Sequence, residues 1–157
     1  MTYSQAVTKA TQEELEKGNL YILGQDVKLW GGRGNVFRGL NQKFPDKIYD
    51  TPISEAATAG LATGLAMSGK DVLVSYDFLD FILHSSDQII NHASKINYLS
   101  NGQFTDPVTY YATINSDIGY GATHSQSLEN MFFKVPGLDV VYPSNATDVY
   151  DLLKISL

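Results

Sequence analysis

The sequence predicts a single three-layer α/β domain, in which helices cover both faces of a mostly parallel sheet. Short runs of apolar and β-branched residues recur along the chain and are typical of buried strands. The clearest runs are 20–23, 71–76 and 108–113, and segments with helical spacing separate them. Parallel strands joined in this way need helices on both faces of the sheet. With 157 residues, of which 43% are hydrophobic, the chain is long enough to bury one complete core.

The first predicted helix is marked at both of its ends. Thr2 and Gln5 are spaced as a capping box, which predicts a helix that runs to about Lys17 and ends at Gly18. The strand over 20–23 follows. The next predicted segments are a glycine-rich loop over 24–34, a short helix over 36–44 and a brief extended segment over 47–49.

A run of small residues from Ala56 to Gly69 predicts a helix that packs closely on its neighbours, with Ser54 as its N-cap. The strand over 71–76 follows this helix. The remaining predicted elements are helices over 78–99 and 127–133, a strand over 138–142 that ends at Pro143, and a final helix from about Ala146 that is capped by Ser144 or Asn145.

The composition excludes several classes of protein. There is no cysteine, so disulfide frameworks and thiolate metal sites are excluded. A net charge of −6 argues against nucleic acid as a partner, because phosphate binding needs a basic face. No apolar run approaches the roughly 20 residues that span a bilayer, and the N-terminus lacks the basic and apolar parts of a signal peptide. We therefore expect a cytoplasmic protein that binds neither nucleic acid nor membrane.

Glu55 is the first candidate for chemistry. It stands in the first turn of the predicted small-residue helix, directly after an X-Pro segment and Ser54. The local pattern allows two interpretations. Glu55 is either a surface carboxylate that the helix dipole stabilises, or a catalytic carboxylate that a rigid helix end holds towards a pocket. No P-loop or nucleophile-elbow motif is present as a competing centre.

A series of spaced motifs resembles one family, the β subunit of the thiamine-diphosphate-dependent 2-oxo acid dehydrogenase E1 component. The resemblance runs from about Thr2 to the last residue and covers the family's N-terminal, pyrimidine-binding domain. Several motifs in the same order are more specific than any one of them. They are Asp50-Thr-Pro-Ile-Ser-Glu55, Phe78-Leu-Asp-Phe81, Asp87-Gln-Ile-Ile-Asn91, His124-Ser-Gln-Ser127 and Pro136-Gly-Leu-Asp-Val-Val-Tyr-Pro143.

The resemblance implies a transketolase-type fold over residues 1–157, with the family's C-terminal domain absent. Because the sequence stops within an amphipathic segment at Leu157, we expect a truncated chain. The implied activity is oxidative decarboxylation of a 2-oxo acid with acyl transfer to lipoamide, within a heterotetramer. The implied partners are an E1 α subunit, a second β subunit and the E2 acyltransferase core. Magnesium and the cofactor diphosphate would be held through the α subunit, so we expect no metal ligands here and no activity of the isolated chain.

The resemblance also implies roles for individual residues. Glu55 would hydrogen-bond N1′ of the cofactor aminopyrimidine and exchange a proton there, and His124 would act as a second catalytic residue at the mouth of the site. The expected catalytic pair is therefore Glu55 and His124. Contacts with the cofactor are expected from Glu55, Phe81, Ile53, Asp77 and Gln25. Phe81 would pack on the pyrimidine ring, although its pattern alone is equally typical of a core residue.

Some residues depart from the family pattern. Gln25 stands where the family usually has an acid of a hydrogen-bonded carboxylate network, and it cannot ionise. Asp77 replaces an uncharged residue, and Tyr111 replaces an arginine. Two alternatives therefore stay open beside the E1 interpretation. One is half of a transketolase-like enzyme, which uses the same domain and an equivalent Glu. The other is a degenerate, non-catalytic assembly subunit.

Overall fold

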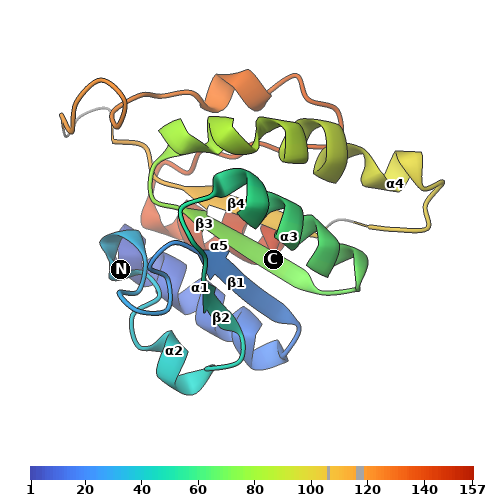
Figure 1. Cartoon of the computed structure of the whole chain (residues 1–157). Helices are drawn as coiled ribbons and strands as arrows, with labels where there is room; N and C mark the ends of the chain where they lie inside the picture. The colour runs from blue at the N-terminus through green and yellow to red at the C-terminus, as the bar shows by residue number, and fades with distance from the viewer. Residues whose placement is uncertain (106, 116–118) are drawn as a thin grey trace.

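The computed structural model describes residues 1–105, 107–115 and 119–157, and its centre is a four-stranded sheet of order β2-β1-β3-β4. All three strand pairs are parallel. The predicted parallel α/β fold is therefore confirmed (Figure 1). The strands are β1 (Leu20–Gly24), β2 (Ile48–Asp50), β3 (Asp71–Tyr76) and β4 (Val108–Ala112).

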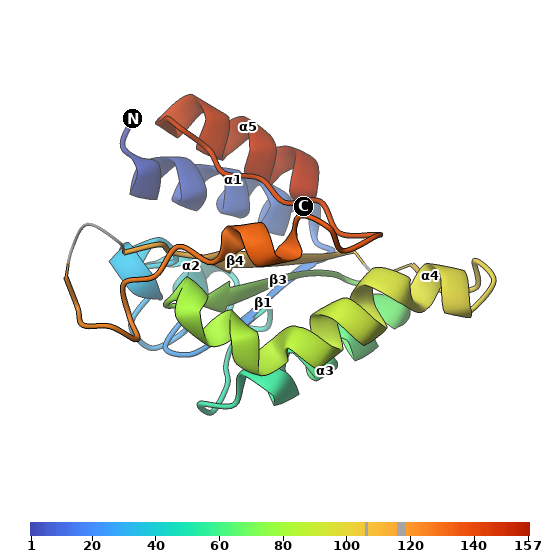
Figure 2. The same ribbon diagram turned by 90° about the horizontal axis from the view of Figure 1, so that it is seen from above.

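Two layers of helices cover the sheet, one on each face (Figure 2). On one face lie α1 (Tyr3–Lys17) and α5 (Ala146–Ser156), and their side chains share an apolar cluster with residues of β1 and β3. On the other face lie α3 (Glu55–Met67) and the helical segment that follows β3, and these share a second cluster with the sheet. Within the described part of the chain, no helix is long and apolar enough to cross a membrane.

Helices α1 and α5 have the end caps that the sequence predicts. Thr2 and Gln5 form both hydrogen bonds of the capping box, and Gly18 ends α1 in the left-handed conformation with φ of 94°. Asn145, one of the two expected caps of α5, accepts hydrogen bonds from the backbone N–H groups of Thr147 and Asp148. These caps satisfy backbone donors that the first turn leaves unpaired.

Ser54 differs from the expectation for α3. It occupies the N-cap position, but its side chain makes no capping hydrogen bond. Instead, the hydroxyl of Thr58 bonds both the carbonyl oxygen of Ser54 and the hydroxyl of Thr51. The start of α3 is therefore held by Thr58, the first buried residue of the helix. Ser54 remains next to Glu55 at the start of the helix.

The segment over 78–99 is helical but is not one α-helix. It begins as the 3₁₀ segment η2 (Leu79–Ser85), passes through the π-helical turn η3 (Gln88–His92) and the short η4 (Ala93–Lys95), and ends as α4 (Ile96–Leu99). Ser94 Oγ and Lys95 Nζ both donate to the carbonyl oxygen of Ile90. Side-chain groups thus donate hydrogen bonds to a backbone carbonyl oxygen at the irregular turn. The spacing of apolar residues in the sequence does not predict this change from one helix type to another.

Three other predicted elements are wrong in whole or in part. The helix over 36–44 is reduced to α2 (Leu40–Lys43), after a short turn η1 (Arg33–Asn35), because Gly39 adopts a left-handed φ of 85°. The strand over 138–142 does not form. Leu138 and Val140 pack against the core, whereas Val141 is 51% exposed. These side chains alternate as they would in a strand, but within the described residues the segment does not pair with a neighbouring strand. The helix expected over 127–133 is the 3₁₀ turn η5 (Glu129–Phe132).

An ion-pair network joins α1 to α5. Lys154 Nζ lies 3.0 Å from Glu13 Oε2 and 2.6 Å from Glu14 Oε1, and Lys17 Nζ lies 2.6 Å from the other oxygen of Glu14. Burial opposes ionisation of Glu14, but the hydrogen bonds from Lys154 and Lys17 outweigh it and lower the pKa of this carboxyl. The pKa of Glu13 is also lowered, first by the hydroxyl of Tyr150 and then by Lys154.

This network predicts acid-sensitive stability. The folded-state pKa values of Glu13 and Glu14 lie below the ordinary value of 4.5, so their contribution is present above that pH and is lost as pH falls through the lowered values. We expect the thermal midpoint to drop with acidification below about pH 4.5, and Lys154→Met to flatten this drop. Thermal unfolding of both proteins over a series of pH values measures this drop in the thermal midpoint. Exposed Lys134→Met is the control, and a Lys154→Met profile parallel to that of the wild type would contradict the prediction.

Candidate active site

A cavity of about 680 Å³ lies at the C-terminal ends of β1 and β3. These strands are neighbours in the sheet, and the chain leaves them in opposite directions, towards β2 and towards β4. In open α/β sheets, ligands bind in the crevice at such a switch point. The cavity residues come from the ends of β1 and β3, the start of α3, η2 and the loop before η5, and are Gln25, Ile53, Ser54, Glu55, Ala56, Tyr76, Asp77, Phe78, Phe81, His84 and His124.

Glu55 is held from the side of β1. Gln25 follows the last residue of β1, and its Nε2 donates to Glu55 Oε1 at 3.1 Å. Tyr76, the last residue of β3, hydrogen-bonds Ser85 Oγ at 2.7 Å across the floor of the cavity. Burial chiefly, with a smaller contribution from the nearby Glu55 carboxylate, raises the pKa of Tyr76 to about 12, against the bond to Ser85, which lowers it. Tyr76 is therefore a neutral phenol, and Glu55 is a fixed carboxyl group in a partly apolar cavity.

Aromatic rings form the opposite wall. The ring of His124 packs edge-on against Phe78 and Phe81, with centroids 4.9 Å and 5.0 Å away. His84 stacks on Phe81 at 6.1 Å with an interplanar angle of 22°. Such edge and offset contacts are favourable arrangements of aromatic rings. The wall can therefore receive a flat heteroaromatic ligand, and it presents two imidazoles beside that position.

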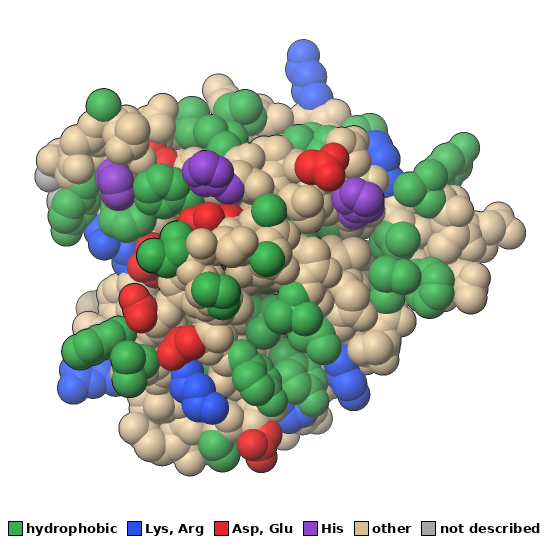
Figure 3. All heavy atoms as spheres, in the orientation of Figure 1, with side chains coloured by type: hydrophobic (Ala, Val, Ile, Leu, Met, Phe, Trp, Pro, Cys, Tyr) green, Lys and Arg blue, Asp and Glu red, His purple; other side chains and the backbone are tan. Residues whose placement is uncertain are grey.

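The loop that carries His124 is tied to η2. Asp80 is buried, and its Oδ1 accepts hydrogen bonds from the backbone N–H of Gln126 at 3.2 Å and from Gln126 Nε2 at 2.8 Å. The hydroxyl of Thr123 lies 2.9 Å from His124 Nδ1. These contacts place the imidazole at the mouth of the cavity. Figure 3 shows this face of the molecule, where carboxylates (red) run down the left half of the view with histidines (purple) above them.

Asp77 is a second carboxylate in the cavity. Burial and the charge of Asp26 raise its pKa, while Arg33 acts in the opposite direction. Its Oδ1 is buried and has no hydrogen-bond partner among the described residues. The cavity thus holds two carboxyl groups in different environments, since Glu55 is bonded by an amide whereas burial raises the pKa of Asp77.

A family model described as the pyrimidine-binding domain of transketolase matches residues 1–157, which is the whole chain. The chain belongs to this family. The cavity therefore lies in a transketolase-type pyrimidine-binding domain, at the switch point of its sheet.

Curated relatives of this pyrimidine-binding domain include E1 β subunits from bacteria, plants and animals. It is 37% identical over 162 residues to the 2-oxoisovalerate dehydrogenase subunit beta of Bacillus subtilis (strain 168). It is 35% identical over 159 residues to a pyruvate dehydrogenase E1 component subunit beta-1, mitochondrial, of Arabidopsis thaliana, and 36% identical over 159 residues to the Homo sapiens mitochondrial subunit beta. Each match covers 100% of this chain but 49%, 44% and 44% of the respective relative, so the chain spans about half their length.

A solved structure described as "Split gene transketolase, inactive beta4 tetramer" superposes on the pyrimidine-binding domain with a TM-score of 0.79. The sequence identity is 20%, and the match covers 99% of this chain and 48% of the other. At this identity the likeness shows the fold alone.

All of the site residues predicted from the sequence line this one cavity. They are Gln25, Ile53, Glu55, Asp77, Phe81 and His124, and their chemical roles stay predictions. Ile53 is 83% exposed, so it stands at the open edge rather than inside. Sequence reasoning missed Tyr76 and His84 as members of the cavity. The rule that ligands bind beyond the carboxyl ends of parallel strands points to Tyr76, the last residue of β3.

Tyr111, the third departure from the family pattern, lies outside this cavity. It packs with the cluster on the face of α1 and α5, where its ring meets Phe37 edge-on at 6.3 Å. The substitution at Tyr111 therefore changes the packing of the opposite face of the sheet, whereas Gln25 changes the cavity itself.

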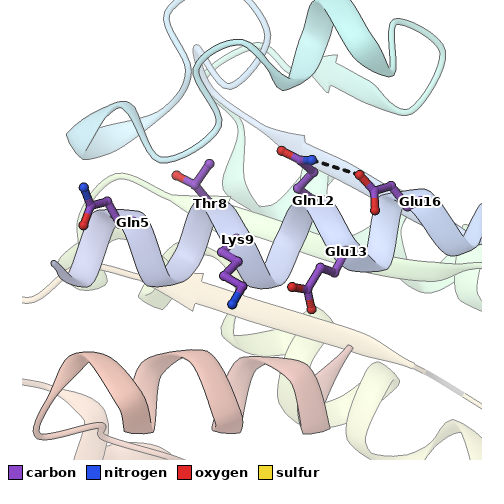
Figure 4. Close-up of a pocket in the computed structure, with 6 residues that line it drawn as sticks. All are labelled: Gln5, Thr8, Lys9, Gln12, Glu13 and Glu16. Carbon is purple, nitrogen blue, oxygen red and sulfur yellow. Dashed lines mark hydrogen bonds between the residues drawn. The ribbon is translucent and has the colours of Figure 1, made fainter. Parts of the chain in front are cut away.

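A second hollow of about 480 Å³ lies on α1 and carries no comparable chemistry. Figure 4 shows that its lining side chains project from a single helix, some towards α5 and others towards the loops near α2. It is an open trough between surface side chains, with Gln12 bonded to Glu16 at 2.8 Å. In the part of the chain that the structure describes, no group of three or more His, Asp or Glu side chains is arranged to hold a metal ion.

Proposed function

We propose that this chain is the pyrimidine-binding part of a thiamine-diphosphate-dependent 2-oxo acid dehydrogenase E1 β subunit. The observation that carries the proposal is the carboxyl group of Glu55, which Gln25 holds at the switch point opposite an aromatic wall. Its relatives, named as β subunits of pyruvate and 2-oxoisovalerate dehydrogenases, support the choice of a 2-oxo acid as the substrate. The reaction would be oxidative decarboxylation with transfer of the acyl group to lipoamide.

The side chains present fit the aminopyrimidine half of the cofactor. A carboxyl group and several aromatic rings line the same cavity of about 680 Å³, which suits one heteroaromatic ring with its substituents. When bound, thiamine diphosphate supplies the carbanion-stabilising chemistry needed to break the bond between carboxyl and carbonyl carbons. Glu55 would hold and move a proton at N1′ of the ring, and Gln25 would orient Glu55. Phe81 would pack on the ring face.

The remaining residues of the cavity would act on the substrate side. His124 stands at the mouth, with its ring fixed by Phe78, Phe81 and the tether from Asp80 to Gln126. An imidazole there can handle a proton on the substrate or the acyl group. Ile53 and Asp77 would contact the cofactor from the edge and the floor of the cavity.

A partner subunit would complete the site. Among the described residues that line the cavity, none is Lys or Arg to neutralise a diphosphate. We propose that an E1 α subunit supplies the diphosphate and magnesium half, within a heterotetramer that contains a second β subunit and delivers its product to an E2 core. The Bacillus relative favours a cytoplasmic setting, whereas several eukaryotic relatives are named as mitochondrial.

One alternative is half of a transketolase-like enzyme, which uses the same pyrimidine-binding domain. The other alternative is a non-catalytic assembly subunit, which the departures from the family pattern at Gln25 and Tyr111 favour. Both alternatives predict no 2-oxo acid dehydrogenase activity with an E1 α partner.

Reconstitution tests the proposal. Co-expressed with an E1 α subunit, the β protein is expected to decarboxylate pyruvate or 2-oxoisovalerate and to acylate lipoamide. The isolated chain is expected to be inactive and to bind thiamine diphosphate with a dissociation constant above about 1 μM, because no Lys or Arg is among the described residues that line the cavity and could pair with the charged half of the ligand. Calorimetric titration with cofactor and magnesium measures the affinity. Submicromolar binding by the isolated chain would contradict the proposal that an α subunit supplies half of the cofactor site. Ketol transfer in place of decarboxylation would support the transketolase alternative.

A further inference from the structure

Arg33 lies beside the mouth of the cavity, on the glycine-rich loop after β1. Its guanidinium carbon is 4.3 Å from the ring centroid of Phe78 and 4.9 Å from that of Tyr120. The two rings pack edge-on with centroids 6.0 Å apart. Phe78 also lines the cavity and touches His124. The guanidinium is therefore held by aromatic faces at the position where a substrate would enter.

A chain of hydrogen bonds fixes one end of the guanidinium. Arg33 Nη2 donates to Asn115 Oδ1 at 3.1 Å, and Asn115 is buried with 4% of its surface exposed. Asn115 Nδ2 in turn donates to the hydroxyl of Thr113 at 3.3 Å, and that hydroxyl donates to the carbonyl oxygen of Asp77. One nitrogen of Arg33 is thus tied to the cavity floor. A guanidinium has five N–H donors, so most of its donors stay available for a ligand.

The charge of Arg33 has no ion-pair partner in the part of the chain that the structure describes. Asp77 feels its field, and Asp26 lies near Asp77, but neither is bonded to the guanidinium as an ion pair. Arg33 is half-buried, whereas the chain's other arginine, Arg38, is exposed to solvent. A half-buried guanidinium that forms no direct ion pair with the described residues, and that rings and an amide orient in advance, is a ready receptor for a carboxylate.

We propose that Arg33 is a substrate-binding residue that takes the carboxylate of the 2-oxo acid. The inference rests on the proposed function, because it assumes that this cavity is the E1 site. The aromatic rings fix the orientation of the guanidinium plane. A carboxylate can therefore accept two parallel hydrogen bonds from its N–H groups, which is the bidentate geometry typical of Arg–carboxylate pairs. Phe78 contacts both the guanidinium of Arg33 and the ring of His124. The carboxylate is bound at the mouth, and the carbonyl carbon points inward.

The test compares ligands with and without a carboxylate in the reconstituted α/β complex. Pyruvate carries the carboxylate, whereas acetaldehyde presents a similar carbonyl without it. We expect Arg33→Met to raise the KM for pyruvate by about 10- to 100-fold, which is the range for a charge-assisted hydrogen-bond pair. The KM for acetaldehyde and the exchange rate of the cofactor C2 proton are expected to stay near those of the wild type. Arg33→Lys should fall between wild type and Met, and Arg38→Met is the matched control.

A binding measurement keeps this inference separate from the proposed function. Acetylphosphonate replaces the carboxylate of pyruvate by a phosphonate and cannot release CO₂, so its affinity can be measured by calorimetry without turnover. If the wild-type complex binds it, and Arg33→Met but not Arg38→Met weakens binding by about 10- to 100-fold, the Arg33 assignment stands even without dehydrogenase activity. Equal losses with pyruvate and acetaldehyde, weakened cofactor binding alone, or no binding of acetylphosphonate to the wild type would each overturn it.

Discussion

Replacing Glu55 by Gln is expected to lower kcat of the reconstituted enzyme by about 10²–10⁴-fold, which is the usual contribution of a general acid–base group. Gln keeps the shape of Glu and can still accept the hydrogen bond that Gln25 Nε2 now donates to Glu55 Oε1. It cannot exchange a proton with a ring nitrogen. The fold is expected to stay intact, because a carboxylate in the first turn of α3 adds only about 0.3–1 kcal/mol through the helix dipole.

Exchange of the cofactor C2 proton is the decisive measurement, because it reports the role of Glu55 before any substrate binds. It should slow in Glu55→Gln together with kcat, while the thermal midpoint changes little. Glu16→Gln is a suitable control, since Glu16 is an exposed carboxylate on α1 whose bond to Gln12 can persist. Exchange at the wild-type rate in Glu55→Gln would restore the simpler interpretation of Glu55 as a surface residue stabilised by the helix dipole.

The parts of the fold that the sequence predicted well are those with a local physical signal. The capping box of Thr2 and Gln5, the left-handed Gly18 and the apolar runs of β1 and β3 each report a requirement of a few neighbouring residues. The strand expected over 138–142 failed for the opposite reason. Its alternation reports which side chains face the core, but a strand also needs a partner edge, and partner edges are set by the rest of the fold.

The candidate site likewise contains residues that the sequence could identify and residues that only the fold brings together. Glu55, Gln25 and His124 could be named because their motifs resemble those of a family, and the structure places them around one cavity. Arg33, Tyr76 and His84 could not be named in this way. Their positions depend on how the loop after β1, the end of β3 and η2 converge, and the lone glycine cluster around Arg33 predicts only a surface loop. The cation–π contacts of Arg33 join residues far apart in the sequence.

Replacing Gly24 by Ala is expected to lower the free energy of unfolding by about 1–3 kcal/mol, the usual cost of overpacking a core. Gly24 is the last residue of β1 and pairs with Ser75 of β3. A Cβ atom at Gly24 would lie 2.5 Å from the carbonyl oxygen of Ser75 and 2.8 Å from Val27 Cγ1. The carbonyl belongs to the backbone of the central strand, so it cannot swing away as a side chain would. β1 and β3 must separate where the cavity opens.

Gly64→Ala is the matched comparison and is expected to have the opposite sign. Gly64 lies within α3, and a Cβ atom there would meet nothing within 4 Å. Alanine in the middle of a helix is more favourable than glycine by about 0.5–1 kcal/mol. Urea unfolding of the two variants measures both changes, and thermal midpoints should move by about 2–4 °C per kcal/mol for a domain of this size. If Gly24→Ala proved as stable as the wild type, β1 and β3 would have to lie further apart at the switch point than the Cβ distances at Gly24 imply.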